Sequence, residues 1–187
     1  MKSRWGASLA PFLLLLGGSV AAAKPLRVAP GSEVSFAAKI TGSSFVGKSE
    51  AVSGTVDYDD ATSNVRSATI VVLANSFKTG MDMRDEHTRD KYLEASKFPE
   101  IRFEVRGAKL AAAPGTRGTL DGTMIVKGSK RSVRAHVTVS GTAAAPVVTA
   151  TFPLNVTEFG IPQPRFAVVK MEPTIQVTAK IVLAPAG

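Results

Sequence analysis

A carboxylate and an imidazole lie close together in the middle of the chain, at Asp85 and His87, with the hydroxyls of Ser76 and Thr79 upstream. A hydroxyl, an imidazole and a carboxylate are the parts of a nucleophilic hydrolase. The spacing does not support that chemistry, because residues at i and i+2 do not share a helix face and no nucleophile-elbow motif is present. The second histidine, His136, alternates with apolar neighbours and so falls on the polar side of a strand. We expect no catalytic residue, and we interpret His87 as a hydrogen-bonding residue at a surface or rim.

Metal binding has no stronger support in the sequence. The chain has no cysteine, and its two histidines lack i,i+4 or His-x-His spacing, so we expect no metal site. Asp57, Asp59 and Asp60 resemble the start of a calcium loop, but the segment lacks the glycine and the terminal glutamate of an EF-hand. A solvated hairpin turn is the simpler interpretation.

Residues 1–23 have the organisation of a secretory signal peptide. Two basic residues precede an apolar run from Leu9 to Leu16, and the small residues Ala21 to Ala23 come just before Lys24. The apolar run is shorter than the roughly 20 residues that span a bilayer. We therefore expect a soluble mature protein, residues 24–187, that is periplasmic or secreted after cleavage near Ala23. No cysteine is present to accept a lipoprotein anchor.

The charge of the chain is moderately basic, with a formal net charge of +8 at pH 7. Cleavage would remove two basic residues and no acid, which leaves a net charge of +6 on residues 24–187. Acids and bases are interleaved rather than clustered, so we expect no nucleic-acid binding. A mild positive potential would still favour transient contact with an anionic membrane surface.

The pattern after the signal peptide is that of one all-β domain. Apolar and polar residues alternate between turn residues, which predicts about eight strands. These strands are expected at 34–40, 52–58, 65–73, 101–105, 120–126, 133–139, 147–154 and 174–183. Lys127 to Lys130 is expected to form a hairpin turn, and Ile70 to Leu73 to be buried on both faces. An antiparallel sheet of this size can hide its edges by closing into a barrel, which is the predicted fold.

A barrel of about eight strands is either filled by side chains or holds one small ligand. Several residues predicted to face inward are small, namely Ala38, Gly54, Gly118, Gly122 and Ala135. Small inward residues leave volume for an apolar ligand. Glycines also relieve strand curvature at barrel bends, so composition leaves a cavity and bend relief equally open.

One short charged insertion interrupts the strands. We predict a helix over Met83 to Leu93, with Asp82 as its N-cap and Asp85 forming an i,i+4 ion pair with Arg89. The helix would act as a lid or rim at the barrel mouth.

Two sides of this helix differ in character. Met81, Tyr92 and Leu93 could form an apolar side facing the barrel. Arg84, His87 and Lys91 share another side at i, i+3 and i+7 spacing.

A series of short motifs runs through the chain in a characteristic order. These are Ser35–Lys39, Phe45–Gly47, Val52–Val56, Thr79-Gly80, Arg84–His87, Phe98–Phe103, Thr123–Gly128, Arg131–Val133 and Glu158–Ile161. Together, over Ser32 to Leu183, they resemble the YceI-like family of periplasmic lipid-binding proteins with a lipocalin-like barrel. The sequence departs from the family pattern between Thr88 and Leu93. The family pattern has a leucine directly after the histidine, where this chain has Thr88, and a pair of phenylalanines where it has Tyr92 and Leu93.

The resemblance implies a non-catalytic protein that carries or sequesters an isoprenoid lipid, either polyprenyl or quinone-like, in an elongated lumen. No other cofactor is implied. Arg84, Asp85 and His87 are candidates for a polar head-group site, and Arg84 and Asp85 could equally tie the lid to the barrel through ion pairs. The candidates for contact with the lipid tail are Phe36, Ile70, Val72, Phe103, Leu120, Met124 and Val137, which could equally be plain core.

Two other functions stay open at this point. A barrel with a filled lumen could act without a ligand, as a stress-response or protein-interaction module. An enzyme acting on a lipid would need a cluster of titratable side chains inside the lumen, and the predicted inward faces contain almost none. The oligomeric state is also open, with a homodimer among the options.

Overall fold

The computed structural model describes residues 24–59, 62–111, 113–142, 145–166 and 169–186. The predicted signal peptide, residues 1–23, lies outside the described residues. Within the described chain, no helix has the length and apolar character needed to cross a bilayer.

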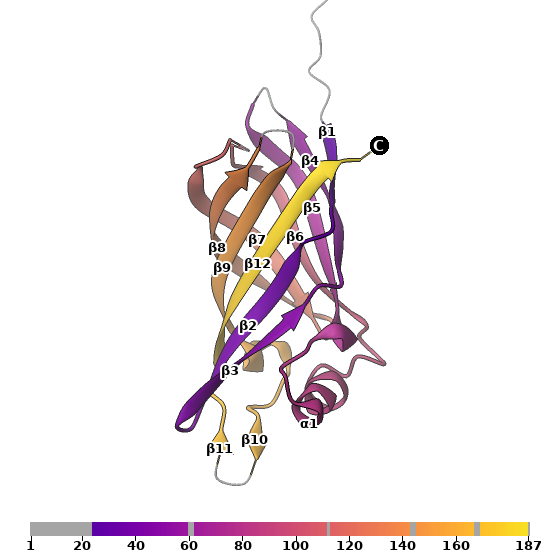
Figure 1. Ribbon diagram of the computed structural model, residues 1–187, viewed down its shortest axis with the longest axis vertical. Helices are drawn as coiled ribbons and strands as arrows, with labels where there is room; N and C mark the ends of the chain where they lie inside the picture. The colour runs from indigo at the N-terminus through magenta and orange to yellow at the C-terminus, as the bar shows by residue number, and fades with distance from the viewer. Residues whose placement is uncertain (1–23, 60–61, 112, 143–144, 167–168, 187) are drawn as a thin grey trace, which may run out of the picture.

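Eight antiparallel strands close into a barrel, which confirms the predicted fold class (Figure 1). Their order around the barrel is β1-β4-β5-β6-β7-β8-β9-β12, and β12 pairs back onto β1. The strands are β1 (Lys24–Val28), β4 (Val52–Asp59), β5 (Asn64–Leu73), β6 (Glu100–Lys109), β7 (Arg117–Val126), β8 (Ser129–Gly141), β9 (Pro146–Asn155) and β12 (Thr174–Pro185).

The strand that closes the ring is not one of the eight that the sequence predicted. The predicted first strand is β2 (Glu33–Ile40), which pairs with the N-terminal half of β12 and with β3 (Ser43–Ser49). Closure is made instead by β1, which pairs with Leu183 to Pro185 of β12 and with β4. Five residues that include a proline are too few to show a period-two pattern, so β1 could not be recognised.

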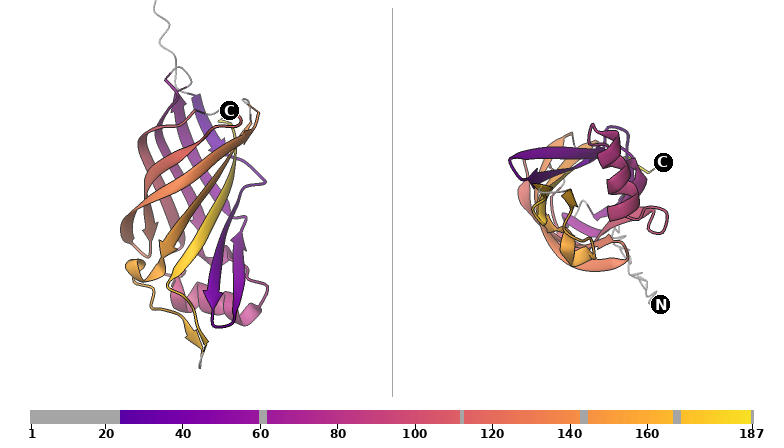
Figure 2. Two further views of the ribbon diagram at one scale, coloured as in Figure 1. Left: turned by 90° about the vertical axis from the view of Figure 1, so that its left-hand side faces the viewer. Right: turned by 90° about the horizontal axis from the view of Figure 1, so that it is seen from below.

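The remaining elements gather at one end of the barrel (Figures 1 and 2). They include a helix and a small hairpin, while the C-terminus lies at the opposite end. Their bounds are η1 (Ala74–Ser76), α1 (Asp82–Glu86), η2 (His87–Tyr92), η3 (Val156–Phe159), β10 (Arg165–Phe166) and β11 (Val169–Lys170). The hairpin β10–β11 was not predicted, because two-residue strands carry no periodic signal.

The predicted helix is present over 82–92, but its details differ from the prediction. The N-cap is Met81 rather than Asp82, and no side chain caps it. Its second half, η2, is a π-helix, in which the amide of Leu93 donates to the carbonyl of Thr88 at 2.9 Å. The predicted Asp85–Arg89 ion pair is wrong, because both residues bond elsewhere in the structure.

Two further local predictions had opposite outcomes. The hairpin turn is confirmed, since Lys127 and Gly128 join β7 to β8 with φ values of 48° and 75°, as a two-residue primed turn requires. Burial on both faces at the end of β5 is wrong, because Leu73 points outward and is 43% exposed.

Aromatic rings occupy the space beside two of the strand glycines. The ring of Phe103 lies over Gly122 and the ring of Phe36 over Gly47, where any Cβ atom would overlap them. Phe103 also stacks on Phe152, with ring centroids 6.1 Å apart. At these positions the missing side chain makes room for a neighbouring ring rather than for empty volume.

Gly122→Ala should therefore destabilise the barrel. The new Cβ would overlap the Phe103 ring and lie 2.8 Å from the carbonyl oxygen of Glu104, which cannot move without the strand. Overpacking of this kind costs about 1–3 kcal/mol, measured as a fall in the free energy of unfolding in urea.

Gly118→Ala is the matched control on the same strand, because its Cβ would meet only a Leu110 methyl group at 3.8 Å. Equal stability of the two variants would contradict this account of Gly122.

Candidate functional site

The barrel encloses a cavity of about 540 Å³ along its axis. This volume lies within the range of about 300–1,000 Å³ that is typical of ligand pockets. Inward side chains from every barrel strand line it, and almost all of them are apolar. Among the described lining residues there is no aspartate or glutamate. The lumen is therefore suited to an apolar ligand.

The two ends of the cavity differ. At the end near the C-terminus it is bounded by buried side chains, including those of Tyr58, Leu110 and Leu183. At the other end, exposed residues join the lining, among them Met81, Met83 and Arg165. The cavity thus opens to solvent at the end where the helix and the β10–β11 hairpin lie, and we call this opening the mouth.

Most of the predicted tail-contacting residues line the cavity. They are Phe36, Ile70, Val72, Phe103, Leu120 and Met124. Val137 is the exception. It is 2% exposed and pairs with Gly118 and Ala150, but it does not line the cavity, so it belongs to the packed wall.

Sequence reasoning missed part of the mouth. Pro164, Arg165, Val169 and Met171 line it from the segment around β10 and β11. The only nearby signal was the turn at Glu158–Ile161, which marks a chain reversal and does not indicate where the following residues go.

The helix places an apolar side against the lumen, as predicted. Met81, Tyr92 and Leu93 all line the cavity. Arg84 and His87 line it as well, whereas Lys91 is exposed.

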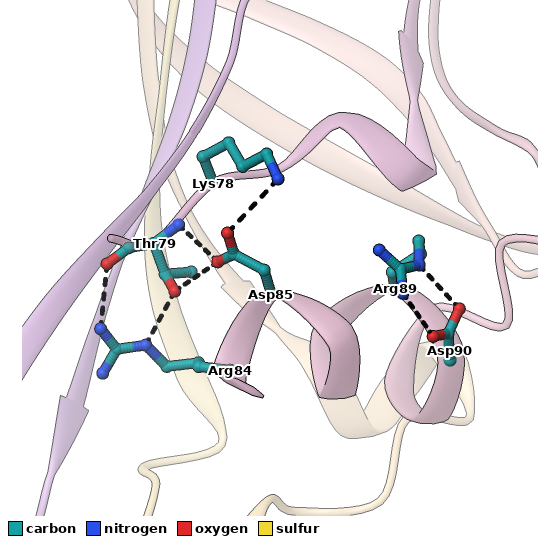
Figure 3. A network of polar contacts seen from close by, with 6 residues as sticks. All are labelled: Lys78, Thr79, Arg84, Asp85, Arg89 and Asp90. Carbon is teal, nitrogen blue, oxygen red and sulfur yellow. Dashed lines mark hydrogen bonds and ion pairs between the residues drawn. The ribbon is translucent and has the colours of Figure 1, made fainter. Parts of the chain in front are cut away.

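The three predicted head-group residues separate in the structure. Arg84 and His87 line the mouth, but Asp85 does not. The Asp85 carboxylate is buried and accepts hydrogen bonds from the amide of Thr79 at 2.7 Å and from its hydroxyl at 2.6 Å (Figure 3). Lys78 Nζ lies 3.7 Å from the other carboxylate oxygen. Asp85 therefore fixes the helix to the segment before it and is not free to bind a ligand.

Arg84 also bonds to Thr79, so it belongs to the same contact that fixes the helix. Its Nε donates to the Thr79 hydroxyl and its Nη2 to the Thr79 carbonyl, both at 2.9 Å (Figure 3). Its guanidinium carbon lies 4.1 Å from the centroid of the Phe45 ring on β3, a cation–π arrangement. Arg84 thus ties α1 to β3 and is also one of the residues that line the cavity.

The anchor determines the ionisation of Asp85. Burial of the carboxyl raises its pKa. The hydrogen bonds from the Thr79 side chain and backbone, together with the charge of Lys78, lower the pKa by more than burial raises it. The net result is a pKa below the ordinary value of 3.8. Asp85 is therefore a carboxylate at neutral pH.

These commitments limit the chemistry of the site. Asp85 bonds to Thr79 rather than to His87, so the two do not form a dyad. Within the described residues, no three His, Cys, Asp or Glu side chains are grouped as metal ligands. The arrangement supports the enclosure of an apolar molecule with a few polar contacts at one end.

Comparison with known proteins agrees with this architecture. A model of the YceI-like domain family matches residues 28–183. No curated protein sequence matches the chain significantly. Similarity to solved structures is at the level of the fold.

Three solved structures illustrate that similarity. A polyisoprenoid binding domain from Saccharophagus degradans, implicated in plant cell wall breakdown, is 18% identical with a TM-score of 0.72, covering 87% of this chain and 99% of that one. BcnA from Burkholderia cenocepacia is 21% identical with a TM-score of 0.69, covering 83% and 98%. The YCEI protein of Campylobacter jejuni is 15% identical with a TM-score of 0.59, covering 73% and 82%.

Asp85→Asn should loosen the lid in a pH-dependent way. A carboxylate whose pKa is lowered by folding contributes stability above its unfolded pKa, and that contribution is lost as the pH falls through the folded value. The variant should exchange its helix amides faster than the native protein at neutral pH. The difference should begin to shrink as the pH falls below the ordinary value of 3.8, and it should disappear only below the lowered pKa of the folded protein, where the native carboxyl is protonated as well.

Asp90→Asn is the control. Asp90 pairs with Arg89 at 2.7 Å on the exposed side of the same helix, where an ion pair contributes little. Hydrogen exchange that is equally fast in both variants would show that Asp85 is not the anchor.

Proposed function

The chain belongs to the YceI-like domain family, and on that premise we propose that it is a non-catalytic carrier or sequestering protein that binds an isoprenoid lipid in the barrel lumen. The observation that carries the proposal is the apolar cavity of about 540 Å³, which opens at one end only and has polar residues at that opening. A polyprenyl chain or a quinone-like lipid has the matching division into a long apolar tail and one polar end.

The energetics of such binding come mainly from the tail. At about 0.8 kcal/mol for each buried CH₂-sized group, one five-carbon isoprene unit contributes about 4 kcal/mol before ordering costs. A tail of a few units needs few polar contacts to bind tightly. The aromatic rings of Phe36, Phe103 and Phe152 offer flat apolar surfaces to such a chain along the lumen.

The polar end of the ligand would lie at the mouth. Arg84 and His87 border the cavity there and offer hydrogen-bond donors, whereas Asp85 is held by Thr79. We therefore assign the head-group contact to Arg84 and His87 and a positioning role to Asp85.

The solved structure described as a polyisoprenoid binding domain supports the same ligand class for this chain through the shared fold. The cavity argues against a ligand-free module, which would have a packed lumen. Residues 1–23 have the pattern of a signal peptide, so we place this function in the periplasm or outside the cell.

Mass spectrometry of an organic-solvent extract tests the proposal. The chain, purified from cells that make isoprenoids, should carry a near-stoichiometric polyprenyl or quinone species. Leu120→Trp combined with Ala150→Trp should lose that species or retain only shorter chains, because both side chains line the cavity and the indoles would fill it.

Thr119→Trp combined with Thr151→Trp is the matched control. These residues alternate with the two lining positions on β7 and β9 and so carry their side chains on the outer face. An empty extract from the folded native chain, even after incubation with prenyl lipids, would overturn the proposal.

A further inference from the structure

Two exposed methionines stand at the edge of the mouth. Met81 is 56% exposed and Met83 is 60% exposed, and both also line the cavity. A single exposed apolar residue needs no explanation. This pair differs because both side chains also line the apolar lumen.

The hairpin across the mouth carries two exposed cations, Arg165 and Lys170. Arg165 and Lys170 are directly opposite each other in the β10–β11 ladder, where two like charges destabilise the pairing. Neither forms an ion pair within the described part of the chain, although exposed cations elsewhere, such as Arg102 and Arg134, do.

A third cation, Lys39, lies beside them. The amide of Thr41 donates to the carbonyl of Lys170 at 3.1 Å, and the amide of Lys170 donates to the Thr41 hydroxyl at 3.2 Å. These bonds join the β2–β3 turn to the hairpin and bring Lys39 to the same edge. Glu172 is the acid nearest to it in the pairing, since its amide donates to the Lys39 carbonyl.

The helix side of the mouth is more nearly neutral. Asp82 and Glu86 are exposed on α1, and the basic side chains of α1 and η2 offset their negative charge. On the hairpin side, the three cations Lys39, Arg165 and Lys170 outnumber Glu172, so the excess positive charge lies there. The exposed apolar surface comes from the helix side.

The elements that carry these residues lie at the same end of the barrel. The helix and the β10–β11 hairpin project from the same end of the barrel, and the C-terminus lies at the far end (Figures 1 and 2). A flat surface could therefore meet the methionines and the cations together.

We propose that this rim, made up of Lys39, Met81, Met83, Arg165 and Lys170, docks the mouth onto a bilayer that contains anionic phospholipids. Cations are attracted to such a surface, and methionine side chains can enter its interfacial region. A lipid could then pass between the bilayer and the lumen without crossing water, a consequence that rests on the function proposed above. The docking itself requires no ligand.

Flotation with lipid vesicles tests the docking directly. The native chain should float with vesicles of phosphatidylcholine mixed with phosphatidylglycerol, and much less with phosphatidylcholine alone. Binding should weaken as salt is raised, because the attraction between exposed charges is screened. Absence of flotation with the anionic vesicles at low salt would overturn the proposal.

Substitutions in the rim test whether it is the surface that binds the vesicles. Lys39→Glu combined with Lys170→Glu should reduce partitioning by about tenfold or more, because each cation near an anionic surface contributes substantially to binding. Met81→Ser combined with Met83→Ser should also reduce it. Lys109→Glu combined with Arg117→Glu is the matched control, since these exposed cations make the same charge change at the end of β6 and the start of β7, away from the mouth.

A control that weakens flotation as much as Lys39→Glu with Lys170→Glu would overturn the proposal, because net charge rather than the rim would then explain binding.

Lipid extracts separate this proposal from the function it builds on. Lys39 and Lys170 do not line the cavity, so their variant should retain the bound lipid while losing flotation. A native chain that carries lipid but does not float refutes the docking alone. A native chain that floats but carries no lipid supports the docking and refutes the proposed function.

Discussion

Closure of the sheet through the pairing of β12 with β1 is the constraint on which the rest of the structure depends. An open sheet would leave two edges of unpaired backbone groups and would expose its apolar face to water. Once the ring is closed, every inward side chain must share one lumen. Eight strands enclose more space than these side chains fill, and the unfilled space is the cavity. The capacity to hold a ligand is thus a consequence of the way the sheet hides its edges.

The lid depends on a second, smaller constraint. Asp85 and Arg84 both bond to Thr79, one residue accepting and the other donating, so the start of the helix is fixed to the segment that leaves the barrel. With this anchor in place, His87 and Arg84 line the mouth. The buried Asp85 carboxylate therefore has a structural role, whereas Arg84 and His87 line the mouth, where the proposed ligand would contact them.

The barrel is polarised along its axis as a result. Buried side chains bound the lumen near the C-terminus, whereas polar and exposed residues gather at the mouth with the helix and the hairpin. Between the two ends, the ring of Phe103 fills the space beside Gly122 on the barrel wall. Such a shape is suited to an elongated apolar molecule that enters from one end, and the membrane contact proposed above lies at that same end.

The sequence by itself determined the strand-rich class, the β7–β8 turn, the single helical insertion and most of the lumen lining, because period-two alternation and turn chemistry are local properties. Tertiary structure alone decided which strand closes the ring, since β1 and the β10–β11 strands are too short to show a period. It also decided that Asp85 bonds to Thr79 rather than to Arg89 or a ligand, and that Val137 joins the wall while Arg165 reaches the mouth. The physical reason is that an inward direction can be read from alternation along one strand, whereas the partner that a side chain meets depends on how distant segments are brought together.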